Sequence, residues 1–87
     1  MILFTKEGCQ KCDWLKDHIM GMKDWPIGIQ IEFLDIETYQ GLAELAYLGL
    51  VGLAEKSLPI LVQGNDRNEP LGVVIGAIRI KRVLEGL

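Results

Sequence analysis

The first third of the chain alternates between strand-like and helix-like sequence, and this alternation limits the topologies open to it. Met1 to Thr5 is short, apolar and rich in β-forming residues, and Ile29 to Leu34 alternates apolar with polar residues, so both stretches predict strands. The sequence between them is helical from Cys9 onward, with an apolar stripe made of Cys12, Leu15, Ile19 and Met22. Pro26 and Gly28 are expected to end this helical region. Two strands joined through a helix should lie parallel, with a right-handed crossover.

The rest of the chain predicts a second helix, two more strands and a final helix. Asp35 to Thr38 is polar and can start a helix, whose expected apolar face consists of Leu42, Leu45, Ala46 and Gly49. Ile60 to Gln63 and Leu71 to Ile75 predict the strands of an antiparallel hairpin, joined by the turn-rich stretch Gly64 to Glu69. The residues expected to line the last helix are Ile78, Ile80, Val83, Leu84 and Leu87. The order β-α-β-α-β-β-α predicts one α/β domain over residues 1–87, with a four-stranded mixed sheet flanked by helices.

Composition and charge exclude several classes of protein. Hydrophobic residues make up 49% of the 87 residues and charged residues 24%, which is ordinary for a soluble globular domain. No apolar run reaches the roughly 18 residues of a membrane span, and the formal charge of −3 gives no nucleic-acid footprint. The first residues already form a predicted strand, with no basic leader before them. We therefore expect a cytoplasmic monomer that binds neither membranes nor nucleic acid.

The two cysteines of the chain, Cys9 and Cys12, carry the functional prediction. Cys9 lies where the first helix is expected to begin, so unpaired backbone N–H groups and the helix dipole should stabilise its thiolate, which is the reactive form. Lys6 and Lys11 add positive charge nearby. Cys12 lies one turn into the helix, on the apolar stripe, and should be the more buried and less reactive thiol. This asymmetry favours a redox dithiol in which Cys9 attacks a substrate disulfide and Cys12 resolves the mixed disulfide.

Two other functions could use the same features. The two thiols could hold Cu(I), or zinc shared across a dimer. His18 is the one further soft ligand, but it lies roughly 180° from Cys9 and about 240° from Cys12 around the helix. It therefore cannot complete a metal site on this helix, and we expect it to be an exposed residue. The second alternative is a redox-inert interaction domain, in which Cys9 reacts no faster than free cysteine.

Taken together, these segments resemble the glutaredoxins, a family within the thioredoxin superfamily, over essentially the whole chain. Before a hairpin and a final helix, the matching motifs are Ile2-Leu3-Phe4-Thr5, Lys6-x-x-Cys9-x-x-Cys12, Phe33-Leu34-Asp35-Ile36 and Ser57-Leu58-Pro59. The resemblance implies a thioredoxin-like fold and the activity of a thiol–disulfide oxidoreductase. It also implies that Pro59 has a cis peptide bond and packs beside the dithiol. Leu58 would then offer its backbone to the substrate as an added strand.

Departures from the family pattern bear on the electron donor. The family's Pro-Tyr between the cysteines is Gln10-Lys11 here, which removes a restraint on the turn and adds positive charge. The family's glutathione site uses a Gly-Gly pair followed by Thr or Ser and Asp at the start of the last helix, and here Gly76 alone matches. Lys6 fits the lysine that contacts a glutathione carboxylate. We expect protein disulfides as substrates, no bound cofactor, and a reductase of the thioredoxin-reductase type as donor, ranked above glutathione as co-substrate. The expected substrate contacts are Lys6, Gln10, Lys11, Leu58, Pro59 and Gly76.

Three further features have both a structural and a functional interpretation. Core packing is favoured over a docking patch for the apolar residues Leu48, Leu50, Val51 and Leu53. Trp14 points off the buried stripe and suits either a docking face or packing at the rim of the core. A solvated face is the expected role of the basic residues of the last helix, Arg79, Lys81 and Arg82.

Overall fold

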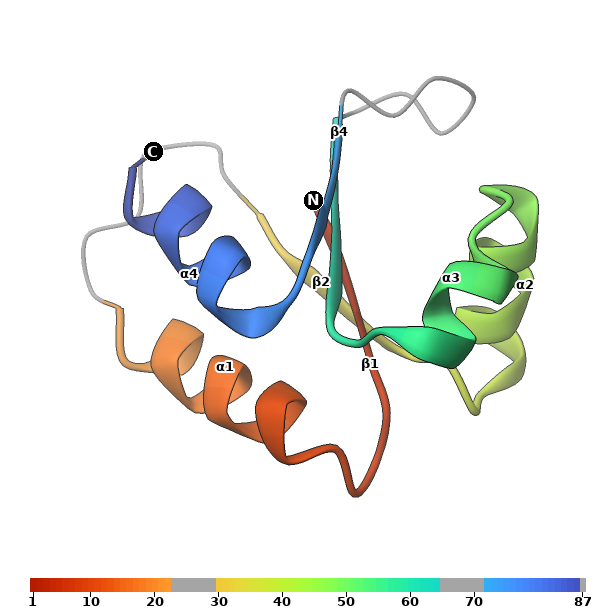
Figure 1. Cartoon of the computed structure of the whole chain (residues 1–87), viewed down its shortest axis with the longest axis horizontal. Helices are drawn as coiled ribbons and strands as arrows, with labels where there is room; N and C mark the ends of the chain where they lie inside the picture. The colour runs from red at the N-terminus through yellow and green to blue at the C-terminus, as the bar shows by residue number, and fades with distance from the viewer. Residues whose placement is uncertain (23–29, 65–71, 87) are drawn as a thin grey trace.

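Figure 1 shows the secondary structure of the chain in a computed structural model that describes residues 1–22, 30–64 and 72–86. The strands are β1 (Ile2–Thr5), β2 (Glu32–Asp35), β3 (Ile60–Gln63) and β4 (Gly72–Ile75). The helices are α1 (Gln10–Met20), α2 (Tyr39–Tyr47), α3 (Val51–Lys56) and α4 (Ala77–Glu85). Within the described ranges, no helix combines the length and the apolarity needed to cross a bilayer.

The four strands form one mixed sheet, as the sequence predicted, and their order in the sheet is β2-β1-β3-β4. β1 lies parallel to β2, with Leu3 opposite Phe33, and antiparallel to β3, with Phe4 opposite Ile60. β3 and β4 are antiparallel. The parallel pair is linked through α1, as expected of a strand–helix–strand unit.

Helices cover both faces of the sheet. In Figure 1, α1 and α4 lie on one side of the sheet, and α2 and α3 lie on the other. Adjacent residues of β1 point to opposite faces, so Leu3 and Phe4 are both fully buried in separate clusters. Leu3 packs with the residues Leu15, Ile19, Ile80 and Leu84 of α1 and α4. Phe4 packs with Leu34, Leu45, Ala54 and Ile60, from both neighbouring strands and from α2 and α3.

The single helix predicted before the third strand is in fact two helices. α2 ends at Tyr47, and the chain then turns through Gly49, which has a φ of +73°. The Gly49 N–H donates to the Ala46 carbonyl and the Leu50 N–H to the Leu45 carbonyl, each at 3.0 Å, which is the Schellman arrangement. The described order is therefore β-α-β-α-α-β-β-α, with α3 as the additional helix.

The predicted inward faces of two helices were partly wrong. In α2, Thr38 caps the helix, and the residues that face the sheet side are Gly41, Leu45 and Leu48, at a spacing of four and three. The predicted face of this helix is exposed at Leu42, Ala46 and Gly49. In α4, Ile78 is 62% exposed, because Ala77, Ile80 and Leu84 form the buried stripe. The prediction of core packing for the stretch at residues 48–53 is confirmed, since Leu48, Leu50, Val51 and Leu53 pack against the Phe4 cluster.

Other differences lie at the ends of elements. β2 runs from Glu32 to Asp35, later than predicted, and Asp35 belongs to the strand instead of the following helix. The predictions for Pro26, Gly28, Ile29, Leu71, Leu87 and the turn from residue 65 to 69 lie outside the described residues.

Gly41→Ala is predicted to destabilise the fold by about 1–3 kcal/mol, because the added methyl group would overlap the backbone carbonyl of Asp35. Gly52→Ala is the matched control, since a Cβ atom there meets open space, and it should be neutral or stabilise by up to about 1 kcal/mol. Urea denaturation followed by circular dichroism measures both changes. Equal effects of the two substitutions would contradict the close approach of α2 to the end of β2.

Candidate functional site: the Cys9–Cys12 dithiol and its surroundings

The loop between β1 and α1 fixes the position of Cys9. Gly8 has a φ of +82°, a conformation that favours glycine. The turn is closed by a hydrogen bond of 3.2 Å from the Cys9 N–H to the Lys6 carbonyl. Cys9 is therefore held in extended conformation as the residue that caps the first turn of α1.

The Cys9 sulfur acts as the cap of α1. Its Sγ accepts a hydrogen bond of 3.3 Å from the backbone N–H of Cys12, which is one of the helix N–H groups without a carbonyl partner. Cys9 is half-buried, so its sulfur can meet a substrate while keeping this hydrogen bond. The structure thus places Cys9 at the start of the helix, as the sequence predicted.

Cys12 is the buried partner of the pair. It is fully buried on the inward stripe of α1, and the pKa of its thiol is raised to about 12, chiefly by burial. The hydrogen bond with the Cys9 side chain and the charges of Cys9 and Asp13 contribute to this increase, while a hydrogen bond with the Lys6 backbone opposes it. Both cysteines are free thiols, and Cys12 holds its proton at neutral pH. The predicted asymmetry in exposure between the two thiols is therefore present.

The Leu58–Pro59 peptide bond is cis, as the resemblance to the glutaredoxins implied. Pro59 is fully buried, and its carbonyl accepts a hydrogen bond of 3.0 Å from the Gly76 N–H. Among the described residues, no backbone hydrogen bond involves the N–H or the carbonyl of Leu58. Leu58 therefore has a backbone donor and acceptor available to another extended chain.

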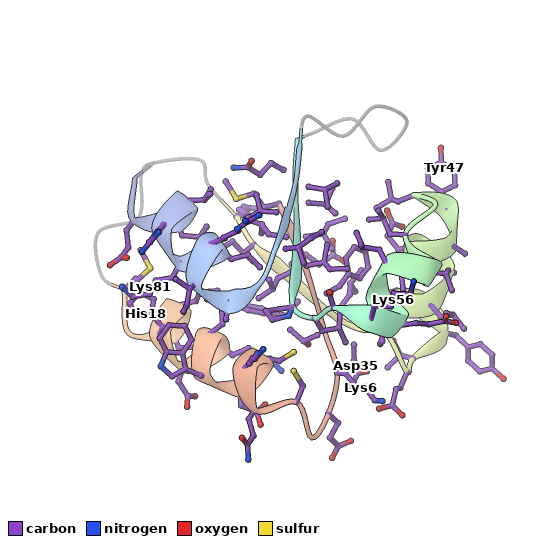
Figure 2. The ribbon with its side chains drawn as sticks, viewed as in Figure 1. Lys6, His18, Asp35, Tyr47, Lys56 and Lys81 are labelled. Atoms are coloured by element: carbon purple, nitrogen blue, oxygen red, sulfur yellow. The ribbon has the colours of Figure 1, made fainter. Side chains whose placement is uncertain are left out.

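Two open depressions meet at the segment from Lys56 to Leu58. The Cys9 depression has a volume of about 580 Å³ and is lined by Lys6, Glu7, Gly8, Cys9, Ile36, Ala54, Glu55, Lys56, Ser57 and Leu58. The α1–α4 groove has a volume of about 610 Å³ and is lined by Gln10, Lys11, Trp14, Lys56, Ser57, Leu58, Ile75, Gly76, Ala77, Ile78 and Arg79. Figure 2 labels Lys6 and Lys56, which come from the loop after β1 and from the end of α3.

Most of the residues predicted to contact substrate line one of these two depressions. Lys6 and Leu58 lie with Cys9, while Gln10, Lys11 and Gly76 lie in the α1–α4 groove. Pro59 and Cys12 line neither depression and are buried. Sequence reasoning did not assign Lys56, Ser57, Ile78 or Arg79 to the site. Ile78 could have been found, because it lies off the stripe formed by Ile80, Val83 and Leu84.

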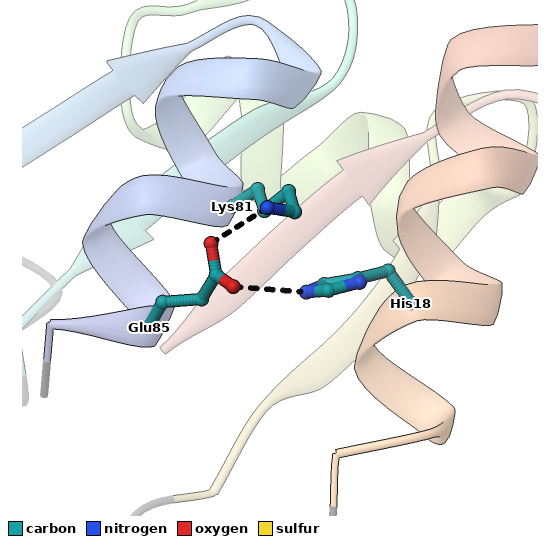
Figure 3. Close-up of polar contacts among 3 residues, drawn as sticks. All are labelled: His18, Lys81 and Glu85. Atoms are coloured by element: carbon teal, nitrogen blue, oxygen red, sulfur yellow. Dashed lines mark hydrogen bonds and ion pairs between the residues drawn. The ribbon is translucent and has the colours of Figure 1, made fainter.

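The expectation that His18 is an exposed residue was wrong. Its side chain is 28% exposed, and its ring stacks on Trp14 with 6.0 Å between ring centroids. The His18 Nε2 atom lies 3.9 Å from the Glu85 Oε2 atom of α4, and the Lys81 Nζ atom lies 2.8 Å from the other carboxylate oxygen. Figure 3 shows these contacts between the two helices and within α4. Since α1 and α4 pack together, His18 contacts a residue distant in sequence that helix periodicity cannot reveal.

The described part of the chain contains no group of three or more histidine, cysteine, aspartate or glutamate residues arranged to hold a metal ion. Comparisons with protein-family models, with curated proteins and with solved structures found no match. The function proposed below is therefore argued from the site itself.

Alkylation of the native protein is predicted to discriminate between the two thiols. With iodoacetamide at about pH 8, Cys9→Ser should be modified at least about a hundredfold more slowly than Cys12→Ser. The remaining thiol in Cys9→Ser is buried, and burial is the largest of the causes that raise its pKa. The rate for Cys9→Ser should also rise about tenfold per pH unit, until the protein unfolds. Mass spectrometry of the intact chain measures both rates, and in urea they should become equal. Equal rates in the native state would contradict the asymmetry.

Lys81→Met is predicted to lower the melting temperature at neutral pH, and to lower it less as the solution is acidified. The hydrogen bond from Lys81 lowers the pKa of Glu85 below its ordinary value. A lowered pKa in the folded state stabilises the protein above the ordinary carboxyl pKa, and this stabilisation disappears as the pH falls through the lowered value. Arg82→Met, which removes an exposed charge from the same helix, is the control. A decrease in melting temperature that is the same at every pH would contradict this account.

Proposed function

We propose that this chain is a small cytoplasmic thiol–disulfide oxidoreductase of thioredoxin-like fold, similar to the glutaredoxins, that reduces disulfides of other proteins. The observation that carries the proposal is the pairing of a partly exposed cysteine at the start of α1 with a buried cysteine one turn later. The mixed sheet with helices on both faces and the cis Leu58–Pro59 bond beside Gly76 also support it.

The first step is attack by the Cys9 thiolate on one sulfur of a substrate disulfide. A bond forms between the Cys9 Sγ and that sulfur, while the disulfide bond breaks and its electron pair leaves with the other sulfur. The departing thiolate takes a proton from solvent. The N–H groups at the start of α1 lower the cost of the anion that reacts.

The second step uses the Cys12 thiol, which first has to transfer its proton to water. In the mixed disulfide, the Cys9 sulfur no longer carries a charge, so two of the causes that raise the Cys12 pKa are weakened. The Cys12 thiolate then attacks the Cys9 sulfur and releases the substrate as a thiolate, which is protonated. The substrate gains two electrons, and the chain is left with a Cys9–Cys12 disulfide. A reductase returns the two electrons.

The unpaired backbone of Leu58 supports a protein substrate. An extended peptide can add to a free backbone edge through its own N–H and carbonyl groups. Leu58 lines the depression that contains Cys9, so a segment paired there would carry its disulfide toward the reactive sulfur.

The start of α4 favours a reductase over glutathione as the electron donor. The residue before this helix is Gly76, and no side chain caps the helix with a hydrogen bond. The residues that follow are Ala77, Ile78 and Arg79, so the hydroxyl and carboxylate of the family's glutathione site are absent. We therefore infer a donor of the thioredoxin-reductase type.

The assay that tests this function measures insulin reduction with thioredoxin reductase, beside turnover of a small mixed disulfide with glutathione and glutathione reductase. We expect activity in the first assay and at least about a thousandfold loss in Cys9→Ser. Cys12→Ser should keep the first step and accumulate a mixed disulfide, which mass spectrometry detects as the mass of the substrate added to the chain.

The outcomes of the two assays discriminate between the candidate functions. Activity with glutathione alone would overturn the choice of donor and keep the oxidoreductase. Inactivity in both assays would overturn the proposal, and stoichiometric Cu(I) binding that needs both cysteines would then replace it.

A further inference from the structure

The α1–α4 groove has an apolar floor that is open to solvent. Trp14 is 47% exposed and Ile78 is 62% exposed, and both line this groove together with Leu58 and Ile75. Exposing two large apolar side chains at one place costs free energy unless a partner covers them. The placement beside the dithiol makes this surface a candidate for substrate recognition.

The charged residues of the groove all have the same sign. Lys11, Lys56 and Arg79 come from three different helices, α1, α3 and α4, and each of them is exposed. Among the described residues, the lining of this groove includes no aspartate or glutamate. The whole chain is acidic, with a formal charge of −3, so this cationic rim is a local exception.

The neighbouring depression differs in charge. Around Cys9, the cations Lys6 and Lys56 are accompanied by Glu7 and Glu55. The positive potential is therefore concentrated on one side of Leu58, the side toward α4. A peptide paired with Leu58 would meet mixed charge at its disulfide and positive charge along the adjoining part of its chain.

We propose that the α1–α4 groove binds an extended acidic segment of a partner protein, next to the disulfide that Cys9 reduces. Apolar side chains of the segment cover Trp14 and Ile78, and its carboxylates face Lys11, Lys56 and Arg79. This inference rests on the proposed function and names the class of substrate within it.

A protein segment fits this surface better than glutathione does. Glutathione has carboxylates but no apolar side chain, so it would leave the floor at Trp14 and Ile78 uncovered. A segment with both acidic and apolar residues can place its carboxylates at the cationic rim and its apolar side chains over the floor. Complementary charge mainly increases the rate of encounter and the specificity.

Binding is tested without redox chemistry, on the Cys9→Ser chain. The probes are fluorescently labelled peptides of equal length that carry an alkylated cysteine, two leucines and either glutamates, serines or lysines. Anisotropy should give about tenfold tighter binding for the glutamate peptide than for the lysine peptide, since exposed charge pairs each contribute a factor of a few. At about 0.5 M salt the ratio should fall toward about twofold. In a Trp25→Phe background, the glutamate peptide should also change the emission of Trp14.

Charge reversal identifies the surface responsible. Arg79→Glu should reduce the ratio of the affinities for the glutamate and lysine peptides to about twofold or less. Arg82→Glu is the matched control, because it makes the same change in the same helix at an exposed residue that does not line the groove, and it should keep most of the ratio. Equal affinity for the three peptides, or equal effects of the two reversals, would overturn the proposal. Binding of S-methylglutathione as tight as that of the glutamate peptide would also overturn it.

A separate measurement distinguishes this inference from the proposed function. The wild-type chain is assayed for reduction of a small neutral disulfide, which carries neither carboxylates nor a peptide segment. If the wild-type chain does not reduce this disulfide but still binds acidic peptides more tightly, the redox function is overturned and the binding surface remains. Activity without any charge preference would overturn the binding surface and leave the redox function.

Discussion

The structure depends on the burial of β1 between two other strands and two layers of helices. Leu3 and Phe4 are fully buried on opposite faces, so this one strand holds both hydrophobic clusters together. Its antiparallel pairing with β3 sets Phe4 opposite Ile60. The end of β1 therefore lies beside the start of β3, and the loop that carries Cys9 is brought next to the Leu58–Pro59 bond.

The pairing of β3 with β4 brings the start of α4 to the site as well. β3 and β4 are antiparallel with Ile60 opposite Ile75, so the start of α4 lies at the same edge of the sheet as Pro59. The hydrogen bond from the Gly76 N–H to the Pro59 carbonyl continues this ladder. Three segments distant in sequence thus meet at one edge, because three strand ends meet there. The two depressions follow from this topology, and the side chains at the segment ends decide what those depressions bind.

Local sequence was enough to predict the strands, the first helix and the dithiol at its start, because these follow from periodicity and from helix termini. It was not enough for features that depend on distant contacts. The break between α2 and α3 is an exception, because it is local: Gly49 weakens the predicted helix in the sequence, but its positive φ and the second helix that follows are seen only in the structure. The inward contact of His18 depends on Glu85, more than sixty residues away. Arg79 was grouped with Lys81 and Arg82 by sequence, yet Arg79 lines the groove while Lys81 bonds to Glu85.

The two helices that form the walls of the groove use different faces for the groove and for the core. One face carries exposed residues that line the groove, such as Trp14 in α1 and Ile78 in α4. Another face packs on the sheet through residues such as Leu15 and Ile80, which are fully buried. Toward their C-terminal ends, the two helices also meet through the contact between His18 and Glu85 (Figure 3). Because the core contacts come from the buried faces, an exposed groove residue such as Ile78 can change without removing a contact that holds the helices on the sheet.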